Sequence, residues 1–356
     1  MVPLLLAAAD LAAPPSLLSV TGDVRVRVED DLNDISGAGV PRADRLRLRV
    51  RAHLNAALQP ARDVRLLVRV RTATPGSQQN PNVTFADFGN NPNDLLRLTP
   101  DRYELVVGDN RTALHAGRML FPFFTPNEYF WDAAIAPLGI AANASRGALR
   151  VTGGAFRLPV GLDHFAGSLY GGQALVDAKP RLLAAALYAF RPDLASPARL
   201  ILLDNNGSRR YSVIALNGIV RRPLGSRTLA LGLDLYRNLE RYRGTTDPVT
   251  RTYRRARTGY VATIAWGDVA RRGHAQVGYR YSNIEKLAVN ASYAHIDLAR
   301  FGTAAQGALS DLKGHDLFAN YALSKHWLIG ARVMFMRRIS TSERGDRARL
   351  DVTYSF

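Results

Sequence analysis

The chain has 356 residues, a formal net charge of +17 and a mean hydropathy of −0.11. No stretch approaches the roughly 18–20 consecutive apolar residues of a membrane-spanning helix, so a helical membrane protein is excluded. The absence of cysteine excludes disulfides and thiolate metal sites. Mean hydropathy does not exclude membrane-spanning strands, because such a strand needs only about 9–11 residues, of which every second one is apolar.

The N-terminus begins with MVPLLLAAAD, in which Leu4 to Ala9 form a short apolar segment with an A-x-A-like site. We interpret residues 1–13 as a residual signal peptide without a basic n-region, the alternative being a disordered, Ala-rich N-terminus. A single domain is expected from residue 18 to residue 356.

Alternation with a period of two begins at Val20–Glu29 and predicts the first strand. Asp30 to Arg42 follows, with Gly37, Gly39 and Pro41, and is expected to form a polar turn. Its acidic cluster (Asp30, Asp31 and Asp34) matches no calcium loop, so we expect a solvated loop.

Arg45–Asn55 (RLRLRVRAHLN) and the stretch from Val64 to Arg71 alternate apolar and basic residues. With the first strand they place a ladder of guanidinium groups on one face: Arg25, Arg27, Arg45, Arg47, Arg49, Arg51, Arg65, Arg69 and Arg71. A dry core would exclude such a face, which must therefore border water. Nucleic-acid-binding sheets interleave aromatic residues for base stacking. These two strands contain none, so no nucleic-acid partner is expected.

Short and long connections alternate further along the chain. Ala73–Asp94 is expected to be a long loop, Gly108–Arg111 a tight turn, and Leu120–Arg146 a long loop rich in aromatic residues. Later alternating segments include a strand at Ala198–Asp204 and one long or bulged strand from Gly273 to Asp297, which together give sixteen strands. If Asn283–Lys286 is instead a turn, the even number requires eighteen.

The chain ends in RARLDVTYSF, in which Leu350, Val352, Tyr354 and Phe356 share one face. A soluble sandwich could have such an edge strand. The segment also resembles the closing strand of bacterial outer-membrane β-barrels. In that family a terminal Phe is part of the signal read by the barrel-insertion machinery, which implies such a role for Tyr354 and Phe356.

Several interior segments extend the resemblance over residues 45–356: GSQQNPN, the hairpin around GDN, AGRM, WDAAIAPLGIA, YRYSNIEKLAV, KGHD and NYALSKHW. Together they resemble a family of porins of Gram-negative bacteria. The resemblance implies an all-β transmembrane antiparallel barrel in the outer membrane, in contact with lipid and lipopolysaccharide, with association into a homotrimer as a further expectation. The loop after the fifth strand would enter the lumen and carry Glu128, Trp131 and Asp132. The family usually has acids where this chain has Leu287 and Ala134, so no specific acidic site is implied.

No catalytic, phosphate-binding or metal-binding motif occurs, and neither enzyme activity nor a cofactor is expected. The remaining chemistry is electrostatic, because rings of arginine favour anions in pores. We expect the nine arginines to line the pore, with Glu128 and Asp132 facing them across a constriction, and small hydrophilic solutes to diffuse through with a preference for anions. The alternatives are arginines that only solvate the lumen, and a non-conducting barrel with a structural or adhesive role.

Overall fold

The computed structural model describes residues 17–73, 81–89, 93–160, 164–193, 209–294, 298 and 310–356. The predicted signal segment and the predicted strand at Ala198–Asp204 lie outside these residues.

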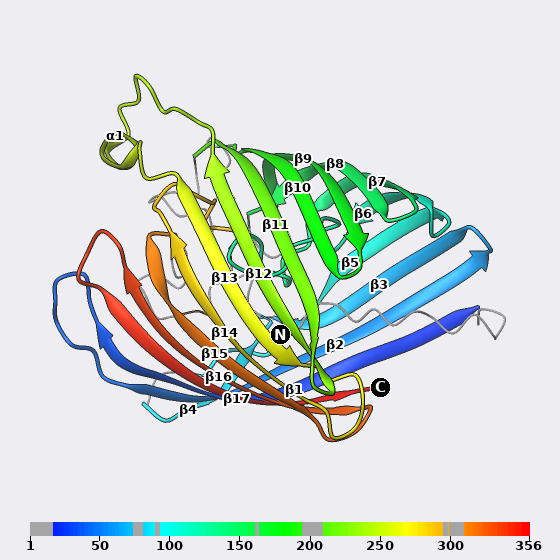
Figure 1. Cartoon of the computed structure of the whole chain (residues 1–356), viewed down its shortest axis with the longest axis horizontal. Coiled ribbons are helices and arrows are strands. Elements are labelled where there is room, and N and C mark those ends of the chain that lie inside the picture. The colour runs from blue at the N-terminus through cyan, green and yellow to red at the C-terminus, as the bar shows by residue number, and fades with distance from the viewer. Residues whose placement is uncertain are drawn as a thin grey trace.

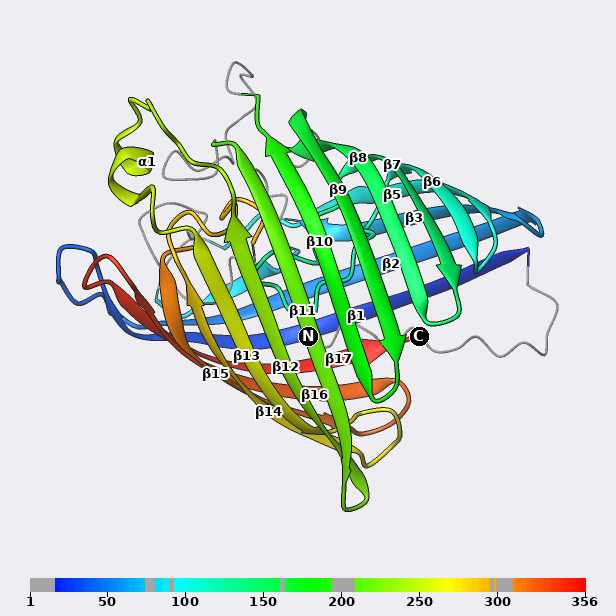
Figure 2. The ribbon, with the colours of Figure 1, turned by 45° about the horizontal axis from the view of Figure 1, so that its top comes forward.

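Sixteen antiparallel strands within the described residues close into a barrel (Figures 1 and 2). The strands of the wall are β1 (Leu18–Ile35), β2 (Arg45–Ala61), β3 (Val64–Ala73), β5 (Arg97–Gly108), β6 (Thr112–Arg118), β7 (Leu138–Arg146), β8 (Leu149–Pro159), β9 (Phe165–Ala178), β10 (Arg181–Arg191), β11 (Tyr211–Leu224), β12 (Arg227–Asn238), β13 (Thr258–Gly267), β14 (Ala275–Ile284), β15 (Leu312–Ala322), β16 (Trp327–Arg338) and β17 (Arg344–Ser355). The barrel closes because β1 pairs with both β2 and β17. The predicted all-β barrel is thereby confirmed.

Period-two alternation decides which side chains face outward. On β1, Val24, Val26 and Val28 are 40–42% exposed, whereas Arg25 and Arg27 are only 3–4% exposed. Because a pleated strand sends successive side chains to opposite faces, valine covers the outside of this strand and arginine its inside. The barrel therefore has an apolar exterior and a charged interior along β1, as a spanning barrel requires.

The two ends of the barrel differ in their connections. Short turns, such as residues 62–63 between β2 and β3, lie at the end that holds the C-terminus, which we call the short-turn end. The opposite, long-loop end carries α1 (Pro248–Tyr253), between β12 and β13 (Figure 1). Asp247 caps this helix by accepting from the backbone N of Val249 at 3.1 Å. No helix in the described ranges is long and apolar enough to span a bilayer.

Four expected loops, turns and strands differ from the structure. The expected loop at Ala73–Asp94 contains a short strand, β4 (Val83–Asp87), which pairs with β2 outside the barrel wall. The expected loop at Leu120–Arg146 ends early, because its last part is β7. The inward residues of β7 are Gly139, Ala141 and Asn143, of which only one is polar. The alternation between polar and apolar residues is therefore weak in this strand.

The third error is the long strand from Gly273 to Asp297. The wall strand β14 ends at Ile284, and residues 285–294 turn into the barrel. Leu287, Val289 and Tyr293 alternate as in a strand but are fully buried inside the barrel. Alternation alone cannot separate an outward strand from an inward segment that packs against a core.

The expected polar turn after Glu29 is also wrong, because β1 continues to Ile35. Asp31 and Asp34 are 0–1% exposed, so they are interior groups of the barrel and do not belong to a solvated loop. Ion pairs of Asp31 with Arg47 and Arg347 explain why the strand tolerates that acid.

Candidate functional site: the barrel interior

The inward faces of β1, β2 and β17 carry arginines and carboxylates in register. Arg27 of β1 lies opposite Arg49 of β2 and opposite Asp351 of β17. Its Nε and Nη2 atoms donate to the Asp351 carboxylate at 2.6 and 2.9 Å. Because directly opposed like charges destabilise a sheet, the carboxylate from the other neighbouring strand offsets the Arg27–Arg49 pair.

Glu29 is the centre of this arrangement and is fully buried. Its carboxylate contacts guanidinium nitrogens of Arg47 at 2.6 Å, Arg49 at 2.9 Å, Arg349 at 3.0 Å and Arg27 at 3.4 Å. One acid therefore links arginines from three adjacent strands. A buried charge that is paired in this way avoids the large cost of desolvation without a partner.

The same kind of pairing extends around this side of the barrel. Further ion pairs join Asp31 to Arg47 and Arg347, Asp23 to Arg51 and His53, Asp101 to Arg69 and Arg71, and Asp316 to Arg280 and Arg332. We call the inward-facing charged residues of β14–β17, β1–β3 and β5 the charged wall.

The arginines predicted to line the pore occupy this wall to different degrees. Seven of them are at most 8% exposed, namely Arg25, Arg27, Arg47, Arg49, Arg51, Arg69 and Arg71. Arg45 lies nearer the long-loop end and pairs with Asp87 of β4 at 2.6 Å. Arg65 is partly exposed and lies opposite the buried Val106, so it shares the inward face. Their action on a permeating solute stays a prediction.

A second side of the interior is aromatic. We call it the aromatic wall: Phe156 of β8, Tyr188 and Phe190 of β10, Tyr211 of β11 and Tyr236 of β12, together with Phe121, Phe123, Phe130 and Trp131 of the loop at residues 119–137. This loop follows the fifth strand of the wall, as predicted, and enters the barrel. Its aromatic side chains fill the space between it and the strands.

Trp131 shows how the loop is held. Its indole is 1% exposed and stacks on Phe121 with ring centroids 4.1 Å apart, and on Tyr293 at 5.4 Å. Its Nε1 donates to the backbone oxygen of Ile135 at 3.2 Å. Stacked rings and a satisfied indole N–H fix the loop against the barrel.

A glycine gives the loop room on β9. Gly171 lies opposite Tyr188, and a Cβ atom at its position would be 2.6 Å from the ring of Phe123. Any larger residue would therefore displace the loop or the ring. Gly172, the next residue, faces open space.

The two loop acids make different contacts, and their predicted action across a constriction stays a prediction. Glu128 lies 3.8 Å from a guanidinium nitrogen of Arg332 on β16, an arginine outside the predicted set. The Asp132 carboxylate accepts from the backbone N of Ala134 at 2.8 Å, and its backbone N donates to the Tyr293 oxygen at 2.7 Å. Glu128 thus approaches the charged wall, whereas Asp132 also shapes the loop backbone.

Sequence reasoning missed several groups of the interior. Arg280, Arg332, Arg347, Arg349, Glu29, Asp316 and Asp351 belong to the charged wall but were not proposed as site residues. Those on β1, β14 and β17 occupy the polar phase of alternating strands, so the same signal could have found them. Arg332 and Asp316 share their face with apolar residues such as Met334 and Phe318, so the signal is weaker there. Among the described residues, no group of three or more His, Asp or Glu side chains could hold a metal ion.

Comparison with known proteins was informative only at the level of structure. No protein-family model and no curated protein matches the sequence. A mutant of the Rh. blastica porin superposes with a TM-score of 0.55 and 12% identity, covering 95% of this chain and all of that one. Salmonella typhi OmpF, in a complex with daunomycin, gives 0.56 and 13%, covering 95% and 97%. The chain has the porin fold. At these identities the likeness shows the fold alone, and it confirms the architecture that the resemblance to porins implied.

Proposed function

We propose that this protein is an outer-membrane porin through which small hydrophilic solutes diffuse passively, with a preference for anions. The observation that carries the proposal is the combination of an apolar exterior, a closed sixteen-stranded porin fold and an arginine-rich interior in the described residues. Apolar side chains face lipid in such a barrel, whereas polar side chains face the lumen. The arginines of the charged wall would line the solute path.

The anion preference follows from the balance of charge on the charged wall. Within the described residues, the ion-paired arginines of this wall outnumber its carboxylates. Ion pairing therefore reduces the positive potential without cancelling it. Low-dielectric walls concentrate what remains, and rings of arginine favour anions.

The proposal also implies how the barrel is oriented in the membrane and what it contacts there. The long-loop end would face the outside and the short-turn end the periplasm, as in other barrels of this class. The exterior would contact lipid and lipopolysaccharide, and Tyr354 and Phe356 would be read by the barrel-insertion machinery. Association into a homotrimer is a further part of the proposal.

Single-channel recording in a planar bilayer under a salt gradient tests the proposal. We expect stepwise openings and a reversal potential of the sign given by anion selectivity. Cation selectivity would leave the pore and remove the preference for anions. Silence from protein with normal heat-modifiable migration on gels would contradict the pore.

That silent outcome would favour a structural, non-conducting barrel. The aromatic wall supports this alternative, because it packs a whole loop inside the barrel.

A further inference from the structure

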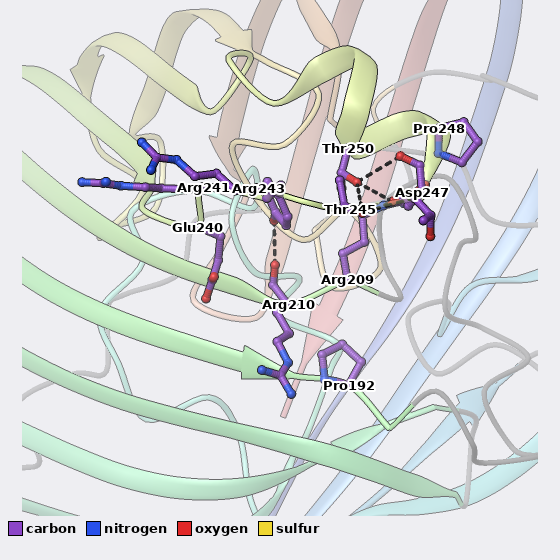
Figure 3. A pocket seen from close by; sticks show the side chains of 12 residues that line it. Pro192, Arg209, Arg210, Glu240, Arg241, Arg243, Thr245, Asp247, Pro248 and Thr250 are labelled. Carbon is purple, nitrogen blue, oxygen red and sulfur yellow. Dashed lines mark hydrogen bonds and ion pairs between the residues drawn. The ribbon is translucent and has the colours of Figure 1, made fainter.

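A cleft of about 1020 Å³ lies at the long-loop end, outside the charged wall (Figure 3). Residues at the adjoining ends of β10, β11 and β12 form one side, and the segment leading into α1 forms the other. Its volume is at the upper end of the range for pockets that enclose small ligands. The proposed function gives this cleft no role.

Three arginines of the cleft are available to a ligand. Arg210, Arg241 and Arg243 are exposed, and none of their side chains forms a hydrogen bond or ion pair with another described residue. Arginine carries a planar array of donors that matches the geometry of carboxylate and phosphate groups. The cleft therefore presents three unused anion-binding groups.

The two carboxylates of the cleft do not neutralise these arginines, because each has another partner. Arg209 binds Asp247 with two of its nitrogens and holds the pKa of that carboxyl at about 2, so Asp247 stays ionised and paired. Glu240 lies 3.3 Å from Arg191 and accepts from the Ser212 hydroxyl at 2.7 Å. Among the described residues, the charge of Arg210, Arg241 and Arg243 is thus not neutralised by a carboxylate of the cleft.

Tyr242 supplies a second, independent sign of a built site. Its φ of 51° is in the left-handed region, which is strained for an aromatic residue. The backbone is held there because the Tyr242 hydroxyl donates to the Arg210 oxygen at 2.6 Å and accepts from Asn238 Nδ2 at 2.9 Å. These two hydrogen bonds tie the β12 end of the cleft to the β11 end.

The chemistry of the lining indicates what the cleft would accept. Thr245 and Thr246 add hydroxyl groups that can both donate and accept, and Pro192 and Pro248 add small apolar surfaces. Sugars combine apolar ring faces with hydroxyl groups, and the arginines add a requirement for negative charge.

We propose that this cleft binds an anionic saccharide, whose carboxylate or phosphate groups pair with Arg210, Arg241 and Arg243. The saccharide could be free in solution or the headgroup of a glycolipid, because both present the same groups. This site is independent of conduction, and it is intact whether or not the barrel passes solutes.

Titration calorimetry on the folded, detergent-solubilised protein tests the site, with tetragalacturonate as the anionic probe and maltotetraose as its neutral match. We expect the triple variant R210A/R241A/R243A to bind tetragalacturonate at least about tenfold more weakly, a loss of about 1.4 kcal/mol. Maltotetraose should bind more weakly than tetragalacturonate to the unchanged protein.

The matched control is R251A/R254A/R255A, which removes the same charge from exposed arginines of the same loop that do not line the cleft. We expect it to retain affinity within about threefold, because these exposed side chains do not line the cleft and their charges are screened by salt. Heat-modifiable migration and single-channel conductance should be unchanged in both variants, since neither touches the barrel interior. An equal loss of affinity in both variants would overturn the proposal.

A parallel titration with lipopolysaccharide micelles identifies the source of the ligand. Loss of micelle binding in the cleft variant alone supports a lipid-linked saccharide, and loss of tetragalacturonate binding alone supports a soluble one. A cleft variant that binds both probes as tightly as the unchanged protein, or an unchanged protein that binds neither, would sink the idea.

Discussion

The charged wall and the aromatic wall share one barrel but depend on different physics. Glu29 contributes only while guanidinium groups surround it, whereas Trp131 contributes through volume and stacking. The inserted loop packs its rings on the aromatic wall and directs Glu128 at the charged one. Shape and electrostatics are therefore set by different residues, and substitutions on the two walls should have separable effects.

Removing the largest ring of the aromatic wall should have the largest effect. Trp131→Ala deletes a buried indole, which costs about 3–5 kcal/mol in a packed core. The loop should loosen, so we expect a lower midpoint of unfolding in urea and noisier channel openings with the anion preference unchanged. Leu187→Ala, at a 52% exposed position of β10, is the control. Quiet openings at the original conductance would contradict the anchoring role.

On the charged wall, Glu29→Gln should come next. Loss of the charge leaves several buried arginines without their common partner, although the amide can still accept, so we expect a cost of about 3 kcal/mol. Unlike the Trp131 variant, this one should also shift the reversal potential toward stronger anion selectivity. Asp177→Asn, which removes one charge from an exposed carboxylate of β9 outside the charged wall, serves as the control. An unchanged reversal potential would show that Glu29 does not influence the solute path.

A smaller effect is expected where the loop meets β9. Gly171→Ala places a methyl group against the Phe123 ring and should cost about 1–2 kcal/mol through overpacking. Gly172→Ala is an unusually close control, because the neighbouring Cβ would meet nothing within 4 Å. Urea midpoints compare the two variants, and equal midpoints would mean that the loop adjusts without strain.

The smallest effect is expected from the group that joins the two walls. Glu128→Gln removes a carboxylate 3.8 Å from Arg332. Loss of this carboxylate leaves more of the Arg332 charge uncompensated, so we expect roughly a twofold rise in the anion-to-cation permeability ratio, equivalent to about 0.4 kcal/mol in the relative energy of the ions. The reversal potential measures it, and a fall in that ratio would reverse the assigned sign.

Sequence alone predicted the barrel because alternation on strands such as β1 follows directly from having lipid on one side and polar groups on the other. It also identified the arginines of β1, β2 and β3 as interior residues, but it missed those of β14, β16 and β17. It could not predict Arg27's pairing with Asp351, because register between strands 324 residues apart is not written in either strand alone. Residues 285–294 were misplaced because Leu287 and Tyr293 show the same alternation inside the barrel as other residues show outside it.

The pairing of β1 with β17 also constrains how the protein folds. Gly22 and Phe356 exchange two backbone hydrogen bonds of 3.0 Å, and Glu29 obtains one of its arginines from β17. These contacts span almost the whole chain, so they form late, after the cost of closing a very long loop has been met. Until β1 pairs with β17, the unpaired strand edges and the incompletely neutralised charges oppose entry into lipid. The pairing of β1 with β17 is thus the step at which this chain becomes compatible with a bilayer.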